Sequence, residues 1–191
     1  DHRDLHSFPT RRSSDLDKAQ HHVINHFTGE EMKETRNVLV ESARMARGKA
    51  KSLANLDVSK YNALVMPGGH GAAKNLSDYA FKKDAMTVDP LLAGCIKKAH
   101  AAGIPIGAMC IAPMILAKVL SHVTISLGNE NSASGHAKNM GAKTEITKAG
   151  QVCVDTDNKI VTTPCYMVDS RIGEVFAGAD RMIKEIFKML S

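Results

Sequence analysis

Hydrophobic positions after residue 17 alternate between strand-type runs and helix-type spacing. Short apolar runs at 63–66 and 104–109 predict buried strands, and each is followed by a segment that can turn helical. The stretch 89–103 begins with Asp-Pro and ends in Gly, which are helix start and stop signals. A further amphipathic helix is predicted over 113–120. Strands that alternate with helices predict an α/β fold with a mostly parallel sheet covered on both faces.

Three more elements follow from local patterns. Thr28 and Glu31 form a capping box that predicts a helix over 28–48. The stretch 151–163 alternates around Asp157 and Asn158, which predicts a hairpin. The last helix has a continuous three-four apolar repeat. Its predicted buried residues are Ile172, Val175, Phe176, Ala179, Met182, Ile183, Ile186, Phe187 and Leu190.

The N-terminal stretch "DHRDLHSFPTRRSSDL", residues 1–16, differs from the rest of the chain. It is rich in Ser, Arg and Asp and has neither helical nor strand periodicity. It resembles the translation of a sequencing adapter, and the alternative is a disordered natural extension. We therefore expect 1–16 to be a non-native or disordered leader and 17–191 to form a single domain.

Composition narrows the class of protein. With 191 residues and 43% hydrophobic residues, the chain is long enough to bury one sizeable core. The net charge of +5 is spread out and aromatic residues make up 4%, so no basic, aromatic-rich stripe indicates a nucleic-acid partner. No apolar run reaches membrane-spanning length. The four cysteines form no C-x-x-C pair and no metal-ligand spacing, which predicts a reducing compartment and no metal centre.

The stretch "GIPIGAMCIAPMILAKVL", residues 103–120, places Cys110 between a predicted strand and a predicted helix. A strand that reverses at once into a helix strains its turn residue and needs small neighbours, here Ala108 and Ala112. The helix N-terminus that follows favours thiolate over thiol. We interpret Cys110 as a nucleophile. The alternative is a small buried cysteine that serves packing.

The glycine pair of "VMPGGHGAAKNLS" follows the other predicted strand. In parallel sheets, loops at the carboxyl ends of strands form ligand sites, so we expect this loop to meet the Cys110 turn. The backbone N–H groups of Gly69 and Ile111 are candidates for an oxyanion hole. His70 is a candidate base or orienting group for Cys110, or else a solvent-facing loop histidine. Neither a dinucleotide fingerprint nor a Walker loop is complete here, and we expect no cofactor.

Four stretches together, "VMPGGHGAAKNLS", "GAMCIAP", "ESARMARG" and "VDTDNKIVTTP", resemble the ElbB-type branch of the ThiJ/PfpI superfamily. The resemblance implies a flavodoxin-like three-layer sandwich of the class I glutamine amidotransferase-like type, with Cys110 at a nucleophile elbow. It implies a cofactor-free, glutathione-independent glyoxalase III activity that converts glyoxal or methylglyoxal into 2-hydroxy acids, or a related deglycase activity. A small reactive aldehyde is then the partner, and a homodimer is left open.

Two departures from the family pattern matter. Ile111 stands where many superfamily members carry His, which disfavours peptidase activity. The strand-helix-strand unit at the start of the family fold, with its cysteine-binding acid, is not visible in this chain. We therefore expect exposed apolar faces, poor solubility and little activity.

Two other functions are weighed beside the enzyme. A non-enzymatic stress protein would use an oxidisable Cys110 on the same fold. A glutaminase subunit is disfavoured because no H-x-E pattern follows Val161. The expected location is the cytoplasm, or the mitochondrion in a eukaryote.

Overall fold

The computed structural model describes residues 13–190, and the chain divides after Leu56 into two units. The division falls inside the range 17–191 that the sequence predicts to be one domain. Residues 1–12, which make up most of the predicted leader, lie outside the described residues.

The first unit contains two small sheets and one helix. Strand β1 (Ser13–Asp15) pairs in parallel with β4 (Ala50–Ser52), and β2 (Val23–Ile24) pairs antiparallel with β3 (Glu31–Met32). Leu16 is 1% exposed. Residues 13–16 of the predicted leader therefore belong to a strand and to a buried cluster. The unit ends in a short 3₁₀ turn, η1 (Leu53–Asn55).

The helix of the first unit is shorter than predicted. Helix α1 spans Val38–Met45, and the Asn37 side chain accepts a backbone hydrogen bond in its first turn. The predicted start at Thr28 is wrong, because Thr28 lies in the β2–β3 turn next to Gly29, whose φ is +77°. The predicted cap partner Glu31 belongs to β3. Local hydrogen bonds of the Thr28 hydroxyl and the Asn25 side chain stabilise this turn in place of a helix.

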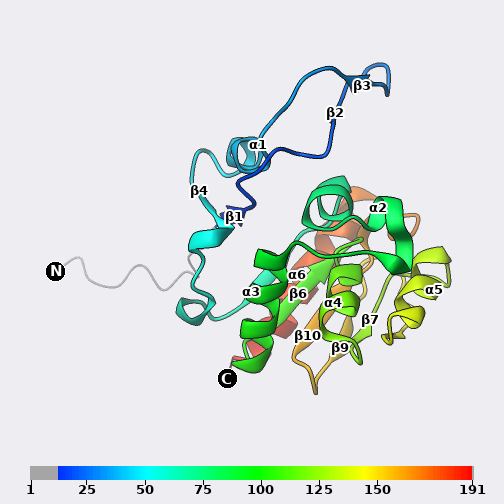
Figure 1. Ribbon diagram of the computed structural model, residues 1–191. Coiled ribbons are helices and arrows are strands. Elements are labelled where there is room, and N and C mark those ends of the chain that lie inside the picture. Colours follow the sequence, from blue (N-terminus) through cyan, green and yellow to red (C-terminus); the bar gives the residue numbers. More distant parts are fainter. Residues whose placement is uncertain (1–12, 191) are drawn as a thin grey trace. The chain divides into compact units, whose positions relative to one another are not determined.

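A four-stranded sheet in the order β5-β6-β10-β9 is the centre of the second unit (Figure 1). The three strands β5 (Leu64–Met66), β6 (Ile106–Met109) and β10 (Ile160–Thr163) run parallel. Strand β9 (Cys153–Asp155) pairs antiparallel with β10. The mostly parallel sheet and the hairpin over 151–163 are thus confirmed.

Helices cover both faces of this sheet. Helices α3 (Pro90–Ala101) and α4 (Pro113–Leu120) contact β6 on one face, and α6 (Ile172–Lys188) packs behind β6 and β10 (Figure 1). Gly107 allows α6 to approach, since a Cβ there would lie 2.7 Å from Ile186 Cδ1. The predicted three-layer α/β arrangement is confirmed. The remaining elements are η2 (Val58–Lys60), the π-helix η3 (Ala72–Leu76), α2 (Tyr79–Lys82), η4 (Lys83–Ala85), β7 (Thr124–Ile125), α5 (Ser132–Asn139), β8 (Lys143–Thr144) and η5 (Cys165–Met167).

The core of the second unit lies between the sheet and these helices. Its side chains are almost entirely aliphatic or methionine, and burying each contributes about 1.5–3 kcal/mol. The largest fully buried members are Met86, Ile96, Ile106, Met114, Ile115, Leu116, Ile125, Leu127, Ile160 and Met182.

Helix α6 buries less than predicted. Gly178, Met182 and Ile186, spaced four residues apart, face the sheet and are buried. Five residues predicted to be buried are exposed: Ile172, Phe176, Ile183, Phe187 and, just after the helix, Leu190. The four that lie within α6 form a strip that we call the outer apolar face. Only one stripe of a straight helix can face a single sheet, and nine apolar positions exceed that stripe.

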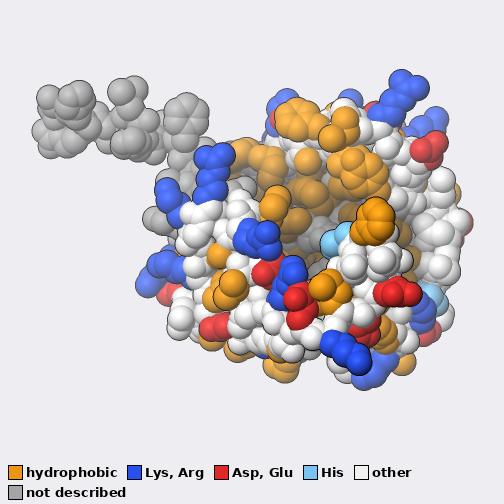
Figure 2. All heavy atoms as spheres, turned by 90° about the horizontal axis from the view of Figure 1, so that it is seen from above, with side chains coloured by type: hydrophobic (Ala, Val, Ile, Leu, Met, Phe, Trp, Pro, Cys, Tyr) orange, Lys and Arg blue, Asp and Glu red, His pale blue; other side chains and the backbone are white. Residues whose placement is uncertain are grey.

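Charged side chains of both signs are mixed on the surface. On the face that Figure 2 shows, Lys and Arg side chains stand beside Asp and Glu side chains. Local pairs include Arg44 with Glu41 at 2.9 Å and Lys184 with Asp180 at 2.7 Å. In the described range 13–190, every helix is too short or too polar to span a bilayer.

Candidate functional site

Cys110 occupies the turn between β6 and α4. Its φ of +59° lies in the left-handed region that non-glycine residues rarely adopt. The Cys110 N–H donates to the Thr163 carbonyl at 3.0 Å, which ties the turn to the end of β10. Ala108 and Ala112, on either side, are fully buried, whereas Cys110 itself is half-buried. The backbone therefore presents a partly accessible thiol at the carboxyl end of the sheet.

The glycine loop after β5 meets this turn. A Cβ added to Gly68 would lie 2.5 Å from Cys110 Cβ and 2.6 Å from the Met109 carbonyl oxygen. Gly68 rather than Gly69 thus lies against the cysteine, a contact that the sequence pattern did not predict. Its signal was the Gly-Gly pair itself, since close backbone approach is one reason for glycine. Gly69, at φ +90°, needs glycine for its backbone conformation.

Two backbone amides, one next to Gly68 and one next to Cys110 in the sequence, have no protein acceptor among the described residues. The N–H groups of Gly69 and Ile111 donate to no other residue within 13–190. The Ile111 nitrogen borders the glycine loop, at 3.0 Å from where a Gly68 Cβ would stand. Free amides beside a thiol can stabilise an oxygen that gains negative charge.

His70 follows the glycine loop as the first residue of the turn that leads into η3. Its side chain is exposed. Among the described residues, the His70 side chain makes no hydrogen bond or ion pair, with Cys110 or with any other group. The structure therefore places His70 on the loop that meets Cys110 but does not join the two side chains.

Cys165 is a second thiol at this end of the sheet. It follows β10 directly after Pro164, is 5% exposed and has a φ of +47°. The pKa of the Cys165 thiol is raised by burial and by the charge of Cys110, against a hydrogen bond from the Cys110 backbone. Sequence alone left open whether this loop reaches the site, because strand order and register cannot be read from it. The pairing of β10 with β6 brings the loop there.

The other two cysteines serve packing. Cys95 lies on the buried side of α3, and burial raises the pKa of its thiol. Cys153 is 1% exposed in β9, with its sulfur 3.2 Å from the Glu145 carboxylate. Burial, followed by the hydrogen bond and charge of Glu145, raises the pKa of Cys153 to about 12.

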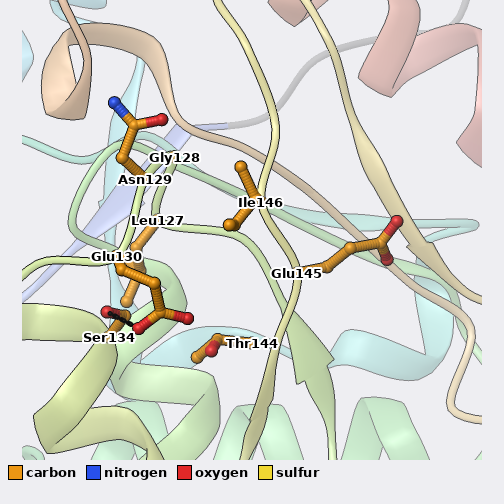
Figure 3. A pocket seen from close by; sticks show the side chains of 8 residues that line it. All are labelled: Leu127, Gly128, Asn129, Glu130, Ser134, Thr144, Glu145 and Ile146. Carbon is orange, nitrogen blue, oxygen red and sulfur yellow. Dashed lines mark hydrogen bonds between the residues drawn. The ribbon is translucent and has the colours of Figure 1, made fainter.

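A shallow surface hollow lies apart from these residues, at the loop after β7 (Figure 3). Thr144 Oγ1 is buried beside it without a hydrogen-bond partner, and the Ser134 hydroxyl donates to Glu130 at 3.2 Å. Neither Cys110 nor His70 lines the hollow. Within residues 13–190, no group of three His, Cys, Asp or Glu side chains is placed to hold a metal ion.

Curated relatives cover most of the chain. It is 39% identical over 183 residues to the human glutamine amidotransferase-like class 1 domain-containing protein 3, mitochondrial. The alignment covers 91% of this chain and 68% of the human protein. The rat ES1 protein homolog, mitochondrial, is also 39% identical, with 91% and 69% covered. The zebrafish (Danio rerio) ES1 protein, mitochondrial, is 28% identical, with 90% and 71% covered. No family model matches the chain.

A solved structure agrees with these relatives. The isoprenoid biosynthesis protein with amidotransferase-like domain from Ehrlichia chaffeensis superposes with a TM-score of 0.86 at 30% identity, over 94% of this chain and 83% of that one. The similar fold and the sequence identity thus both point to amidotransferase-like proteins, and the resemblance seen in the sequence motifs is confirmed. The chain belongs to the ES1 and ElbB-like family of glutamine amidotransferase-like class 1 proteins, within the ThiJ/PfpI superfamily.

Proposed function

We propose that this protein converts glyoxal or methylglyoxal into a 2-hydroxy acid without glutathione, with Cys110 as nucleophile. In the related deglycase activity, Cys110 would attack the adducts that these aldehydes form with other molecules. One observation carries the proposal: Cys110 is held at φ +59° with Gly68 against it and the Ile111 amide beside the same loop. Addition to a carbonyl requires a thiol that attacks the carbon and nearby free N–H groups that stabilise the oxygen as it becomes negative.

The proposed reaction balances with water as the sole co-reactant. The Cys110 thiolate adds to the aldehyde carbon, and the amides of Gly69 and Ile111 hold the resulting alkoxide. Transfer of the aldehyde hydrogen as a proton to the neighbouring carbonyl carbon gives a 2-hydroxyacyl thioester. Water then hydrolyses the thioester, which releases the 2-hydroxy acid and regenerates the thiol. His70 is the candidate proton carrier, and it must turn toward Cys110 to act.

We expect slow turnover from this chain. No carboxylate within residues 13–190 hydrogen-bonds Cys110, so the acid that the family resemblance implies does not hold the thiol here. Without such a partner, the Cys110 thiolate is oriented toward the aldehyde carbon in a smaller fraction of its encounters with substrate. We therefore expect a low kcat that reflects poor positioning of the thiolate.

The direct test is lactate formation from methylglyoxal in the absence of glutathione, followed by NMR. We expect conversion above the buffer blank for the native chain and conversion at the blank rate for Cys110→Ser. Cys95→Ala is the matched control, because Cys95 lies in α3 away from the turn, and it keeps the native rate. Equal rates for native protein and Cys110→Ser would reject the proposal.

We propose redox sensing in a stress response as a second candidate function. The observation that favours it is the second thiol, Cys165, at the end of the neighbouring strand. Loss of aldehyde conversion with retained peroxide reactivity at Cys110 would select this function over the first.

For location, we propose the cytoplasm in a bacterial source and the mitochondrion in a eukaryotic one. The names of the human and rat relatives, both mitochondrial, support the second case.

A further inference from the structure

We propose that Cys110 and Cys165 form a reversible disulfide, in which Cys110 reacts with a hydroperoxide and Cys165 resolves the product. The inference rests on the proposed nucleophilic character of Cys110. It adds Cys165 as a second reactive residue, a disulfide between the two cysteines and hydroperoxides as the class of oxidant. It does not depend on aldehyde conversion.

The positions of the two cysteines follow from the register of the sheet. Thr163, the last residue of β10, pairs with Met109, the last residue of β6. Cys110 and Cys165 are therefore one and two residues beyond a matched pair. Parallel strands lie about 4.8 Å apart, so the turns that end β6 and β10 begin side by side at the same edge of the sheet. Disulfides span Cα distances of about 4.4–6.8 Å.

Contacts hold the two turns together. The Cys110 N–H donates to the Thr163 carbonyl at 3.0 Å, and Cys110 is close enough to Cys165 for its charge to raise the pKa of the Cys165 thiol. Both residues have positive φ, at +59° and +47°, so both strands end in a sharp turn at the same level. A bond between the sulfurs would therefore join two turns that are already in contact.

The two thiols have environments suited to different roles. Cys110 is half-buried and can meet a small oxidant, whereas Cys165 is 5% exposed and cannot. Burial and the charge of Cys110 keep Cys165 protonated, which slows its own reaction with peroxide. Cys165 is shielded from solvent but not from Cys110, so its attack is intramolecular.

The chemistry balances in two steps. The Cys110 thiolate attacks one oxygen of the hydroperoxide, the O–O bond breaks, and sulfenic acid and hydroxide (or an alkoxide) form. The Cys165 sulfur then attacks the sulfenic sulfur, the S–O bond breaks, and the leaving hydroxide takes the Cys165 proton as water. Sulfur is oxidised and the hydroperoxide is reduced. The disulfide blocks Cys110 as a nucleophile and protects it from sulfinic acid until a thiol reduces it.

The test treats the full chain with a slight molar excess of hydrogen peroxide, blocks free thiols with N-ethylmaleimide and maps tryptic peptides without reduction. We expect the peptides 99–118 and 160–171 to be linked, and dithiothreitol to release them. In Cys165→Ala the link is lost and Cys110 accumulates as sulfinic acid. Cys153→Ala, a buried cysteine of the same sheet, forms the link as the native chain does.

Variants and probes separate the outcomes. Cys165→Gly is the second variant, because glycine accepts the positive φ of this position and keeps the turn if Cys165→Ala does not fold. Dimedone capture of a Cys110 sulfenic acid, with sulfinic acid and no linked peptide in the native chain, would overturn the disulfide and leave the nucleophile intact. A Cys110 that neither oxidises nor alkylates would overturn both the disulfide and the proposed function.

Discussion

Gly68 lies directly against Cys110: a Cβ on the glycine would stand 2.5 Å from Cys110 Cβ, closer than two such carbons approach. The two residues come from loops that follow neighbouring parallel strands, β5 and β6. The Cys110 turn therefore depends on the absence of a side chain at position 68, and this dependence can be tested without touching the thiol.

Gly68→Ala is expected to destabilise the fold by about 1–3 kcal/mol, the usual range for an overpacked site. It should also slow alkylation of Cys110, because the turn must shift to admit the methyl group. Urea unfolding and iodoacetamide kinetics measure the two effects. Gly71→Ala is the matched control: a Cβ there meets nothing within 4 Å, and its φ needs no glycine. If Gly68→Ala behaves like Gly71→Ala, the two loops do not pack as described.

The four thiols should react with iodoacetamide in a defined order at neutral pH. Cys110 is expected to react first because it is half-buried, while the other three are buried. Cys153 should react last: with a pKa of about 12, only about one molecule in 10⁵ carries the thiolate at pH 7. Peptide mapping over time measures the order. Faster labelling of Cys153 or Cys165 than of Cys110 would contradict it.

Asp78 should make stability depend on pH in the acid range. Burial raises the pKa of its carboxyl, but hydrogen bonds from Lys82 and from the Thr87 backbone and hydroxyl outweigh this and lower the pKa to about 2. The folded pKa lies below the unfolded value of 3.8, so the stabilisation is complete above about pH 4 and is lost as pH falls from 4 to 2.

Asp78→Asn is the corresponding variant. After allowance for solvent screening, we expect it to cost about 1 kcal/mol at pH 7 and almost nothing at pH 2. Urea unfolding at both pH values measures the difference. An equal cost at pH 2 and pH 7 would show that the charge of Asp78 is not what stabilises the turn.

The outer apolar face of α6 should govern solubility rather than stability. Phe176 is 74% exposed, so Phe176→Lys is expected to change the free energy of unfolding by less than about 0.5 kcal/mol and to reduce self-association. Met182 is fully buried, and Met182→Ala should cost about 2–5 kcal/mol. Sedimentation velocity and urea unfolding separate the two effects. Unchanged association in Phe176→Lys would rule out this face as its cause.

Elements with strong local signals were predicted correctly from the sequence. Helix α3 begins at Pro90 with Asp89 as its cap, as expected, because capping and proline geometry act within one turn. Helix α1 was misplaced because the turn at Gly29 competes locally with the capping box of Thr28.

Long-range features of the site were harder to predict. The extra role of Gly68 and the approach of Cys165 depend on strand order and register, which bring together residues from three loops. The exposed strip on α6 depends on which helical stripe meets the sheet, and an apolar repeat wider than that stripe does not reveal it.

The most direct test of the central claim, that Cys110 attacks the aldehyde, is to locate the covalent intermediate. Native protein is mixed with methylglyoxal, quenched in acid, which preserves a thioester, and mapped by peptide mass spectrometry. The account predicts a 2-hydroxyacyl adduct on Cys110 in the peptide 99–118, absent from Cys110→Ser and present in Cys95→Ala. An adduct confined to lysine or to another cysteine, or lactate release with Cys110 unmodified throughout, would contradict it.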